Sequence, residues 1–293
     1  MPRIVRWIWT LLGFHLALGT IAFLHFVLTG EYALLTWYFW ALGSLFFLIM
    51  TATECGFALV CCSWFDADEP MRLAWLMIAC AALARFTGTL LRGISNPHLT
   101  WVSGHWLGWA SAGLLAGLSQ LGLVVGGPLS MAFLAIGLAR VLRIQRRFHL
   151  IGALTRGDQA LLVLIVAFTF SQIGTILPLL GSHPSAATML LWLSDPLLSL
   201  LLIEAVLVRR SVIRMGQGLV ARCWGMFVLA IATTSAGDAA IWAANHNLLP
   251  EPLNALSWFI WFVAAAAFAC APAYQLAAMS LVKEETVQSP GAN

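Results

Sequence analysis

Long runs of apolar residues, separated by short polar or charged turns, dominate this chain of 293 residues. Seven of these runs reach about 20 residues or more, the length that an α-helix needs to cross the hydrocarbon core of a bilayer. A segment in lipid satisfies its own backbone hydrogen bonds only as a helix, so each run predicts a transmembrane helix. The runs are Trp7–Leu28, Leu34–Trp64, Met71–Leu91, Ala160–Leu180, Ala187–Val208, Leu219–Trp242 and Asn254–Leu281.

The composition is typical of a chain that lies in lipid. Hydrophobic residues make up 61% of the sequence and charged residues only 9%, whereas soluble domains carry about 25% charged residues. So few charges cannot cover a water-exposed surface, and no stretch outside the runs is long enough to fold alone. We therefore expect a single all-α transmembrane bundle over residues 1–282 and a disordered polar tail over residues 283–293.

The stretch Trp101–Arg143 is too long for one helix and leaves the number of spans open between eight and nine. Lys and Arg favour the cytoplasmic side of a membrane. One kinked span from about Leu114 to Leu142, bent at Gly126-Gly127-Pro128, places three arginine groups on that side. The groups are Arg3 and Arg6; Arg140, Arg143, Arg146, Arg147 and Arg156; and Arg209, Arg210, Arg214 and Arg222.

The eight-span arrangement keeps both termini in the cytoplasm and leaves Arg92 alone on the far side. It makes Trp101–Trp109 an interfacial segment whose tryptophans lie at headgroup level. The nine-span alternative places Arg3, Arg6 and Arg72 outside, against the charge rule. We therefore favour eight spans, in a multi-pass protein of the inner (cytoplasmic) membrane.

Glu54 and Arg85 lie near the middle of two consecutive predicted spans, where a charge costs about 2.5–3.5 kcal/mol on insertion scales. The turn between these spans centres near Asp68, which is 14 residues from Glu54 and 17 from Arg85. At about 1.5 Å per residue, the two differ in depth by ~4–5 Å, which long side chains can cover. We expect them to pair inside the bundle, either as a structural ion pair or as part of a substrate or proton-linked site.

Several polar residues fall at the outer ends of the predicted spans and are candidates for ligand or metal binding. Asp195 belongs to a Ser-Asp-Pro sequence that is typical of a capped helix start, and it predicts an interrupted helix. Histidines that converge on one rim are able to bind a metal or haem iron, while unrelated loop histidines are the alternative. The candidates are His25, His98, His105, His183, His246, Asp195 and Asp238.

Glycine pairs at four-residue spacing surround the fourth span. Small residues at this spacing let helix backbones approach closely in lipid. The neighbour is either another helix of this chain or a partner subunit, and the sequence does not decide between them. The pairs are Gly104 and Gly108, Gly113 and Gly117, and Gly122 and Gly126.

The sequence holds 14 tryptophans, most of them near predicted helix ends. Tryptophan is enriched at both membrane–water interfaces, where its amphipathic ring lies at headgroup level. Trp40 and Trp258 follow this pattern. We expect them to be interfacial anchors and not part of a binding site.

Known catalytic motifs are missing from the sequence. It has no P-loop, no GxSxG elbow and no zinc-protease motif. The single lysine, Lys283, lies in the tail, which excludes a retinal Schiff base inside the bundle. We therefore expect a protein that is not an enzyme.

The second half of the sequence resembles a known class of membrane domain. Asp195-Pro196-Leu197-Leu198, the arginines after that span, Gly237-Asp238 and Leu256-Ser257-Trp258-Phe259 before an alanine-rich helix are similar to the multi-span input domains of some bacterial diguanylate cyclases. The usual cytoplasmic catalytic domain is absent. The resemblance therefore implies a stand-alone sensing or interaction module whose output is supplied by another protein.

Three functions are compatible with these features. The first, which we take as the prediction, is a non-catalytic sensor or accessory subunit that contacts membrane lipids and other membrane subunits, and no nucleic acid. The second is an electron-transfer anchor that binds haem or quinone through the outer histidines. The third is a small-molecule transporter with Glu54, Arg85 and the interrupted helix near Asp195 at its binding site.

Overall fold

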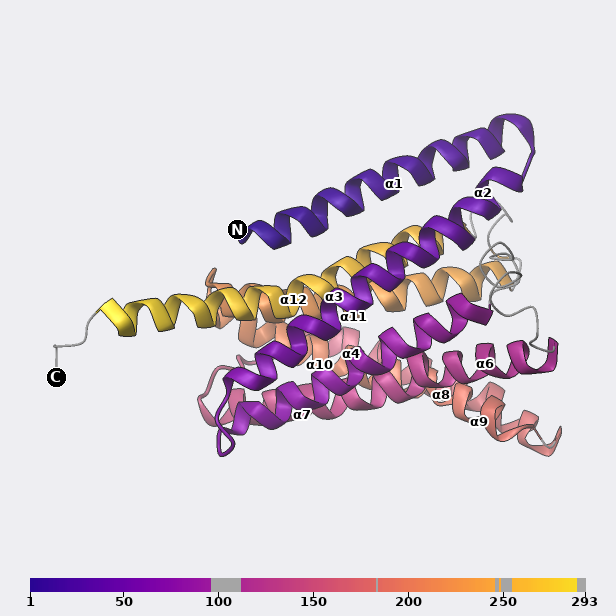
Figure 1. Cartoon of the computed structure of the whole chain (residues 1–293). Coiled ribbons are helices and arrows are strands. Elements are labelled where there is room, and N and C mark those ends of the chain that lie inside the picture. Colours follow the sequence, from indigo (N-terminus) through magenta and orange to yellow (C-terminus); the bar gives the residue numbers. More distant parts are fainter. Residues whose placement is uncertain (96–111, 183, 246–247, 249–254, 289–293) are drawn as a thin grey trace.

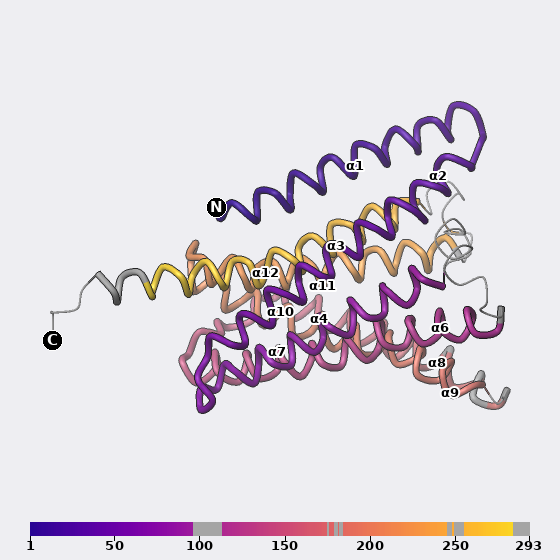
Figure 2. The backbone as a smooth tube through the Cα atoms, viewed as in Figure 1, coloured from indigo at the N-terminus to yellow at the C-terminus, as the bar shows by residue number. Residues whose placement is uncertain are grey.

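The computed structural model describes residues 1–95, 112–182, 184–245, 248 and 255–288, and this part of the chain contains helices and no strand (Figure 1). Eight helical segments are long and apolar enough to cross a membrane, which confirms the predicted all-α bundle with eight spans. Successive spans run in opposite directions, so the first helix begins and the last helix ends at the same end of the bundle (Figure 2).

Within the described residues, the spans are built from 14 helical elements, of which η1 and η3 are π-helical and η4 is a 3₁₀-helix. In chain order they are α1 (Arg3–Thr29), α2 (Ala33–Trp37), η1 (Tyr38–Gly43), α3 (Ser44–Trp64), α4 (Pro70–Ser95), α6 (Ala112–Val124), η3 (Val125–Leu129), α7 (Ser130–Arg147), α8 (Arg156–Ile176), η4 (Leu177–Ser182), α9 (Ala186–Trp192), α10 (Ser194–Met215), α11 (Leu219–Asn245) and α12 (Ala255–Gln288).

The ambiguous central region forms one span, Gly113–Arg147, as the arginine distribution predicts. Its two α-helices, α6 and α7, are joined by the π-helical turn η3, which contains Pro128. Proline has no N–H group for the helical hydrogen-bond pattern, and a single wider turn accommodates it without ending the span. The segment Trp101–Trp109 lies outside the described residues.

The sixth span is interrupted close to the Ser-Asp-Pro sequence. α9 ends at Trp192, α10 begins at Ser194, and Leu193 occupies the N-cap position without a side-chain hydrogen bond. The predicted side-chain cap is therefore not present among these residues. Pro196 lies in the first turn of α10, where a missing N–H group costs least.

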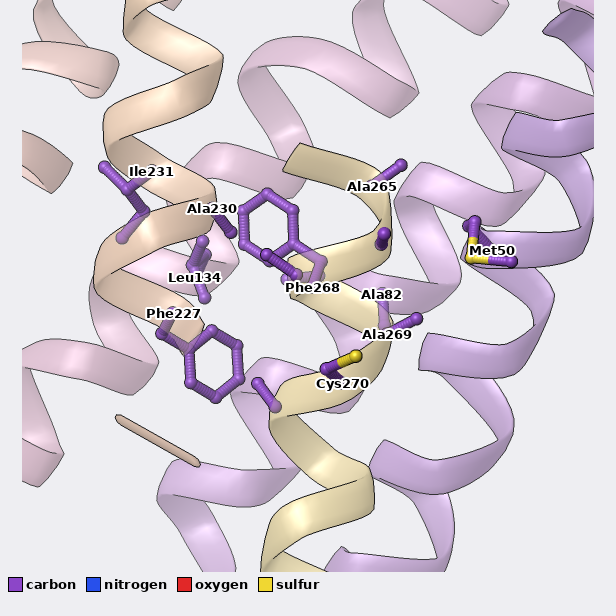
Figure 3. Close-up of a cluster of buried hydrophobic side chains, with 14 of the residues drawn as sticks. Met50, Ala82, Leu134, Phe227, Ala230, Ile231, Ala265, Phe268, Ala269 and Cys270 are labelled. Atoms are coloured by element: carbon purple, nitrogen blue, oxygen red, sulfur yellow. The ribbon is translucent and has the colours of Figure 1, made fainter. Parts of the chain in front are cut away.

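The core of the bundle surrounds α12, the most buried of the eight spans. Every residue from Ala264 to Gln275 is buried, and the small side chains of this stretch let neighbouring helices approach closely. Phe227 of α11 and Leu134 of α7 pack around Phe268 of α12 (Figure 3). α12 is thereby fixed between its neighbours along most of the membrane.

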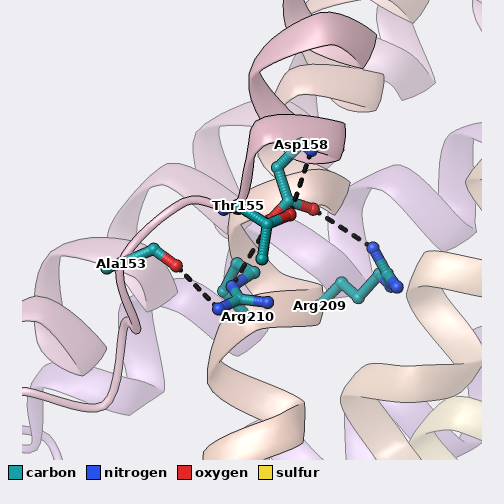
Figure 4. A network of polar contacts seen from close by, with 5 residues as sticks. All are labelled: Ala153, Thr155, Asp158, Arg209 and Arg210. Carbon is teal, nitrogen blue, oxygen red and sulfur yellow. Dashed lines mark hydrogen bonds and ion pairs between the residues drawn. The ribbon is translucent and has the colours of Figure 1, made fainter.

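A polar network ties the start of α8 to the end of α10 (Figure 4). Asp158 accepts hydrogen bonds from the backbone N–H and the hydroxyl of Thr155 at 2.8 and 2.7 Å. Its other oxygen accepts from Arg209 at 3.2 Å, and Arg210 lies 3.6 Å from the same carboxylate. Arg210 also donates to the Ala153 carbonyl at 2.6 Å. The second and third arginine groups therefore lie together, at what we call the arginine-rich end.

The helix α12 continues to Gln288, so it includes residues 283–288 of the predicted tail. Lys and Glu, which make up residues 283–285, are strong helix formers. Lys283 also lies 5.5 Å from the centroid of the Trp64 ring, a cation–π distance. Residues 289–293 lie outside the described residues.

Candidate ligand-binding cavity

A cavity of about 480 Å³ lies between α3, α4, the α6–η3 segment, α11 and α12. Pockets for small molecules have volumes of about 300–1,000 Å³. Four charged residues line the cavity: Glu54, Arg85, Arg92 and Asp238. The first two belong to the middle of the membrane, while Arg92 and Asp238 lie near the ends of α4 and α11. The cavity therefore extends from mid-membrane toward the end opposite the arginine-rich end.

Glu54 and Arg85 form an ion pair at the deep end of the cavity, in the contact expected from the hairpin register. Arg85 donates through Nε to one Glu54 oxygen at 3.1 Å and through Nη2 to the other. Glu54 is 1% exposed and Arg85 14%. The guanidinium carbon also lies 4.2 Å from the centroid of the Phe268 ring. Two-point pairing and an aromatic face are arrangements that suit arginine at a buried site.

Asp238 is held at the cavity wall by Trp261 of α12, whose indole N–H donates to Asp238 Oδ1 at 3.0 Å. Gly237 leaves the space that this ring occupies, because a Cβ atom at Gly237 would lie 2.4 Å from Trp261. Asp195, the other outer carboxylate, is exposed at the start of α10 and is not part of the cavity wall. Of the two outer carboxylates, only Asp238 lines the cavity.

Arg92 is a cavity residue that the sequence did not identify as a site residue. It is exposed, and no ion pair joins it to a carboxylate among the described residues. A Cβ atom at Gly122 of α6 would lie 2.9 Å from Arg92 Cγ, so the arginine stem lies over a glycine. One feature of the sequence could have identified it: Arg92 is the one basic residue between Arg85 and the end of α4.

Aromatic side chains form much of the remaining wall. Trp40, Phe47, Trp258 and Trp261 line the cavity, and Trp258 lies with its ring centroid 5.6 Å from Trp40 and 5.9 Å from Trp261. Trp40 and Trp258 therefore contribute to the cavity, although their positions near helix ends had suggested interfacial anchors. Pattern alone missed this because a ring near a helix end faces either lipid or the bundle interior.

Both π-helical turns adjoin the cavity. Trp40 comes from η1, and Gly126 and Gly127 come from η3. A π-helical turn inside an α-helix is rare and is frequently found at functional sites, because it redirects side chains and loosens the local hydrogen-bond pattern. Two such turns on the walls of one cavity mark it as the best candidate site in the described part of the chain.

Packed side chains fill the bundle between the cavity and the arginine-rich end. Trp75 of α4 and Trp224 of α11 are almost completely buried, with ring centroids 5.9 Å apart. Cys61 of α3 is fully buried, and its thiol donates to the Pro272 carbonyl of α12 at 3.4 Å. Protein interiors packed in this way leave no room for a passing molecule. The cavity is closed on this side.

The glycine pairs divide into two kinds of surface. Gly122 and Gly126 pack against Gly88 of α4, where an added Cβ at Gly88 would lie 2.5 Å from the Gly126 backbone. These two glycines serve contact between helices of this chain. Gly117 has open space where a Cβ would lie, and Gly113 is exposed. Gly104 and Gly108 lie outside the described residues.

The predicted histidine site lies mostly in undescribed segments, since His98, His105, His183 and His246 all belong to them. His25 is half-buried in α1, and its Nδ1 has no hydrogen-bond partner. In the segments that the structure describes, no three His, Cys, Asp or Glu residues are grouped closely enough to hold a metal ion. The haem or metal site stays a prediction.

Comparisons with models of known families, with characterised proteins and with solved structures find no match to this chain.

Proposed function

We propose that this chain is a non-catalytic multi-pass membrane protein that binds a small molecule in the cavity and acts as a sensor or accessory module of a membrane complex. The observation that carries the proposal is a ligand-sized cavity lined by four charged side chains, two of them in the middle of the membrane. Charges inside a membrane are costly and mark functional sites more often than structural ones. A purely structural bundle has no need of the space between them.

The distribution of arginines supports a sidedness for this site. The positive-inside rule places the arginine-rich end in the cytoplasm, so the cavity extends toward the opposite face. The packed layer around Trp75 and Trp224 separates the cavity from the cytoplasmic side. A site that is reached from one side only suits a receptor better than a channel.

Two further features support a module that works with a partner. The resemblance of the second half to the input domains of diguanylate cyclases favours a sensing role. Gly113 and Gly117 on α6 are exposed in the described part of the chain, and a Cβ atom at Gly117 would meet no other atom there. Small residues at a helix surface let the backbone of a partner helix approach closely in lipid.

The proposal is tested by cysteine labelling with a small, uncharged, membrane-impermeant thiol reagent on oriented vesicles. Thr89 of α4 lines the cavity, and Thr89→Cys is expected to react from the face opposite the arginine-rich end. Ala79→Cys on the same helix is the matched control, because Ala79 is 1% exposed within the packed layer. Absence of reaction at Thr89→Cys from that face contradicts a water-accessible site.

Transport is a second candidate, favoured by the interruption between α9 and α10 and by the two π-helical turns beside the cavity. Broken helices are common at the binding sites of transporters. A transporter exposes its site to both sides in turn, so Ala79→Cys becomes reactive from the arginine-rich side. A sensor leaves Ala79→Cys unreactive from both sides. Loss of uptake in Glu54→Gln identifies a transported substrate.

A further inference from the structure

Two of the four cavity charges lack a partner of opposite charge among the described residues. Glu54 and Arg85 satisfy each other through two hydrogen bonds. Asp238 accepts from the neutral indole of Trp261, and Arg92 forms no ion pair with a described carboxylate. Asp238 is half-buried and Arg92 is exposed. The cavity therefore presents one cation and one anion that are available to a bound molecule.

Arg92 has a position that membrane topology does not explain. Basic residues accumulate on the cytoplasmic side, and Arg92 lies near the opposite end of α4. Its stem lies over Gly122, where any larger side chain would collide with it. Arg92 thus belongs to the cavity wall at the contact between α4 and α6. A planar guanidinium is well suited to carboxylate and phosphate groups.

Asp238 lies in an aromatic environment that suits a positively charged group. Trp261 positions its carboxylate, and Trp258 and Trp40 continue the same wall. Ammonium groups bind to tryptophan faces through cation–π attraction, and a neighbouring carboxylate adds to this attraction. The α11–α12 side of the cavity therefore favours a cation.

Given the proposed function, on which this step rests, we infer that the cavity binds a small zwitterion. Arg92 contacts its acidic group, and Asp238 with the tryptophans contacts its ammonium group. The four lining charges sum to zero, and a zwitterion keeps the sum unchanged, whereas a simple anion or cation leaves one wall charge without a partner. Arg92 and Asp238 form no ion pair with each other, so each is left to pair with one of the two charged groups of the ligand.

The inference is tested first without any ligand, by the charge preference of cysteine labelling. Thr89 lies one turn before Arg92 on α4, and Thr234 lies one turn before Asp238 on α11; both line the cavity. We expect Thr89→Cys to react about tenfold faster with an anionic methanethiosulfonate than with a cationic one, and Thr234→Cys to show the reverse. A unit charge ~7 Å away gives this ratio at an effective dielectric constant between those of protein and water.

The controls assign each preference to its residue. Arg92→Gln is expected to abolish the anion preference at Thr89→Cys and to leave the cation preference at Thr234→Cys, whereas Asp238→Asn does the opposite. Arg92→Lys and Asp238→Glu keep both preferences and show that the fold tolerates the sites. If both cysteines react without a charge preference, the inference is wrong while the binding cavity stands. If neither reacts, the proposed function fails together with the inference.

Ligand probes then distinguish the chemical class. We expect 6-aminohexanoate to slow the labelling of both cysteines, while hexanoate slows only Thr89→Cys and hexylamine only Thr234→Cys. Glycerophosphoethanolamine tests a lipid headgroup as the source of the same charge pair, and stronger protection by it than by 6-aminohexanoate assigns the site to lipid. Two results overturn the inference. Hexanoate or hexylamine protects both cysteines as well as the zwitterions do, or no zwitterion protects either cysteine at millimolar concentration.

Discussion

Two buried glutamates in this bundle differ in one respect, and this difference gives a sharp test of the electrostatic reasoning. Glu54 is paired with Arg85, whereas Glu204 of α10 is 6% exposed and its Oε2 has no hydrogen-bond partner. Replacement of each by glutamine removes one ionisable group and keeps the size of the side chain. The two substitutions are expected to have different effects on the free energy of unfolding.

Glu54→Gln leaves the Arg85 guanidinium inside the bundle without its carboxylate partner, between a neutral amide and the Phe268 ring. Removal of one partner from a buried ion pair costs about 3–5 kcal/mol. Because glutamine still accepts one hydrogen bond, we expect about 3 kcal/mol. That value corresponds to a decrease in Tm of roughly 5–10 °C for a chain of this size. Glu54→Met combined with Arg85→Met is expected to recover most of the loss, because both buried charges are then absent.

Glu204→Gln is the matched control. Glu204 forms no ion pair among the described residues, so an amide of similar shape in its place leaves no charged partner unpaired. We expect the free energy of unfolding to change by less than about 1 kcal/mol. Thermal unfolding of the purified protein in mild detergent, followed by gel filtration of the folded fraction, measures both variants. Equal Tm values for Glu54→Gln and Glu204→Gln would refute the assignment of a stabilising ion pair.

Three further outcomes follow from the structure. Gly122→Leu is expected to lower Tm strongly because the new side chain would enter the α4–α6 contact. Gly117→Leu, whose side chain meets open space, is expected to keep Tm and to reduce co-purification of a membrane partner. Equal Tm values for the two variants contradict the packing described. Asp158→Asn is expected to lower Tm more at low than at high ionic strength, since Arg209 is 56% exposed and its attraction to Asp158 is screened by salt. The visible spectrum of the purified protein is expected to show no Soret band, and a Soret band would establish the histidine-based haem site in place of the cavity.

The spans were predictable from the sequence because every helix must match the same bilayer. Its apolar length must cover the hydrocarbon core, and its arginines favour the cytoplasmic side. The sequence also predicted the Glu54–Arg85 contact, because a hairpin fixes the relative depth of two residues. The single fourth span with a bend at Pro128 followed from the same reasoning.

The cavity was not predictable in the same way. In a membrane, both the lipid-facing and the interior sides of a helix are apolar, so the pattern does not show which side faces inward. Trp40 and Trp258 therefore looked like anchors, and Arg92 looked like a topological exception. Asp195 and Asp238 occupy similar depths, but only Asp238 lines the cavity.

Under the proposed function, α12 is the helix that connects the cavity with the opposite end of the bundle. Trp258, Trp261 and Phe268 belong to the cavity wall, and Phe268 contacts Arg85. The following residues to Gln275 are buried and closely packed, so a displacement at Phe268 moves this part of the helix as a unit. A ligand shifts the position of α12 only to the extent that it binds more tightly to one position of the helix than to another. Under the same proposal, the end of α12 near Lys283 is the part of this helix that a partner subunit contacts.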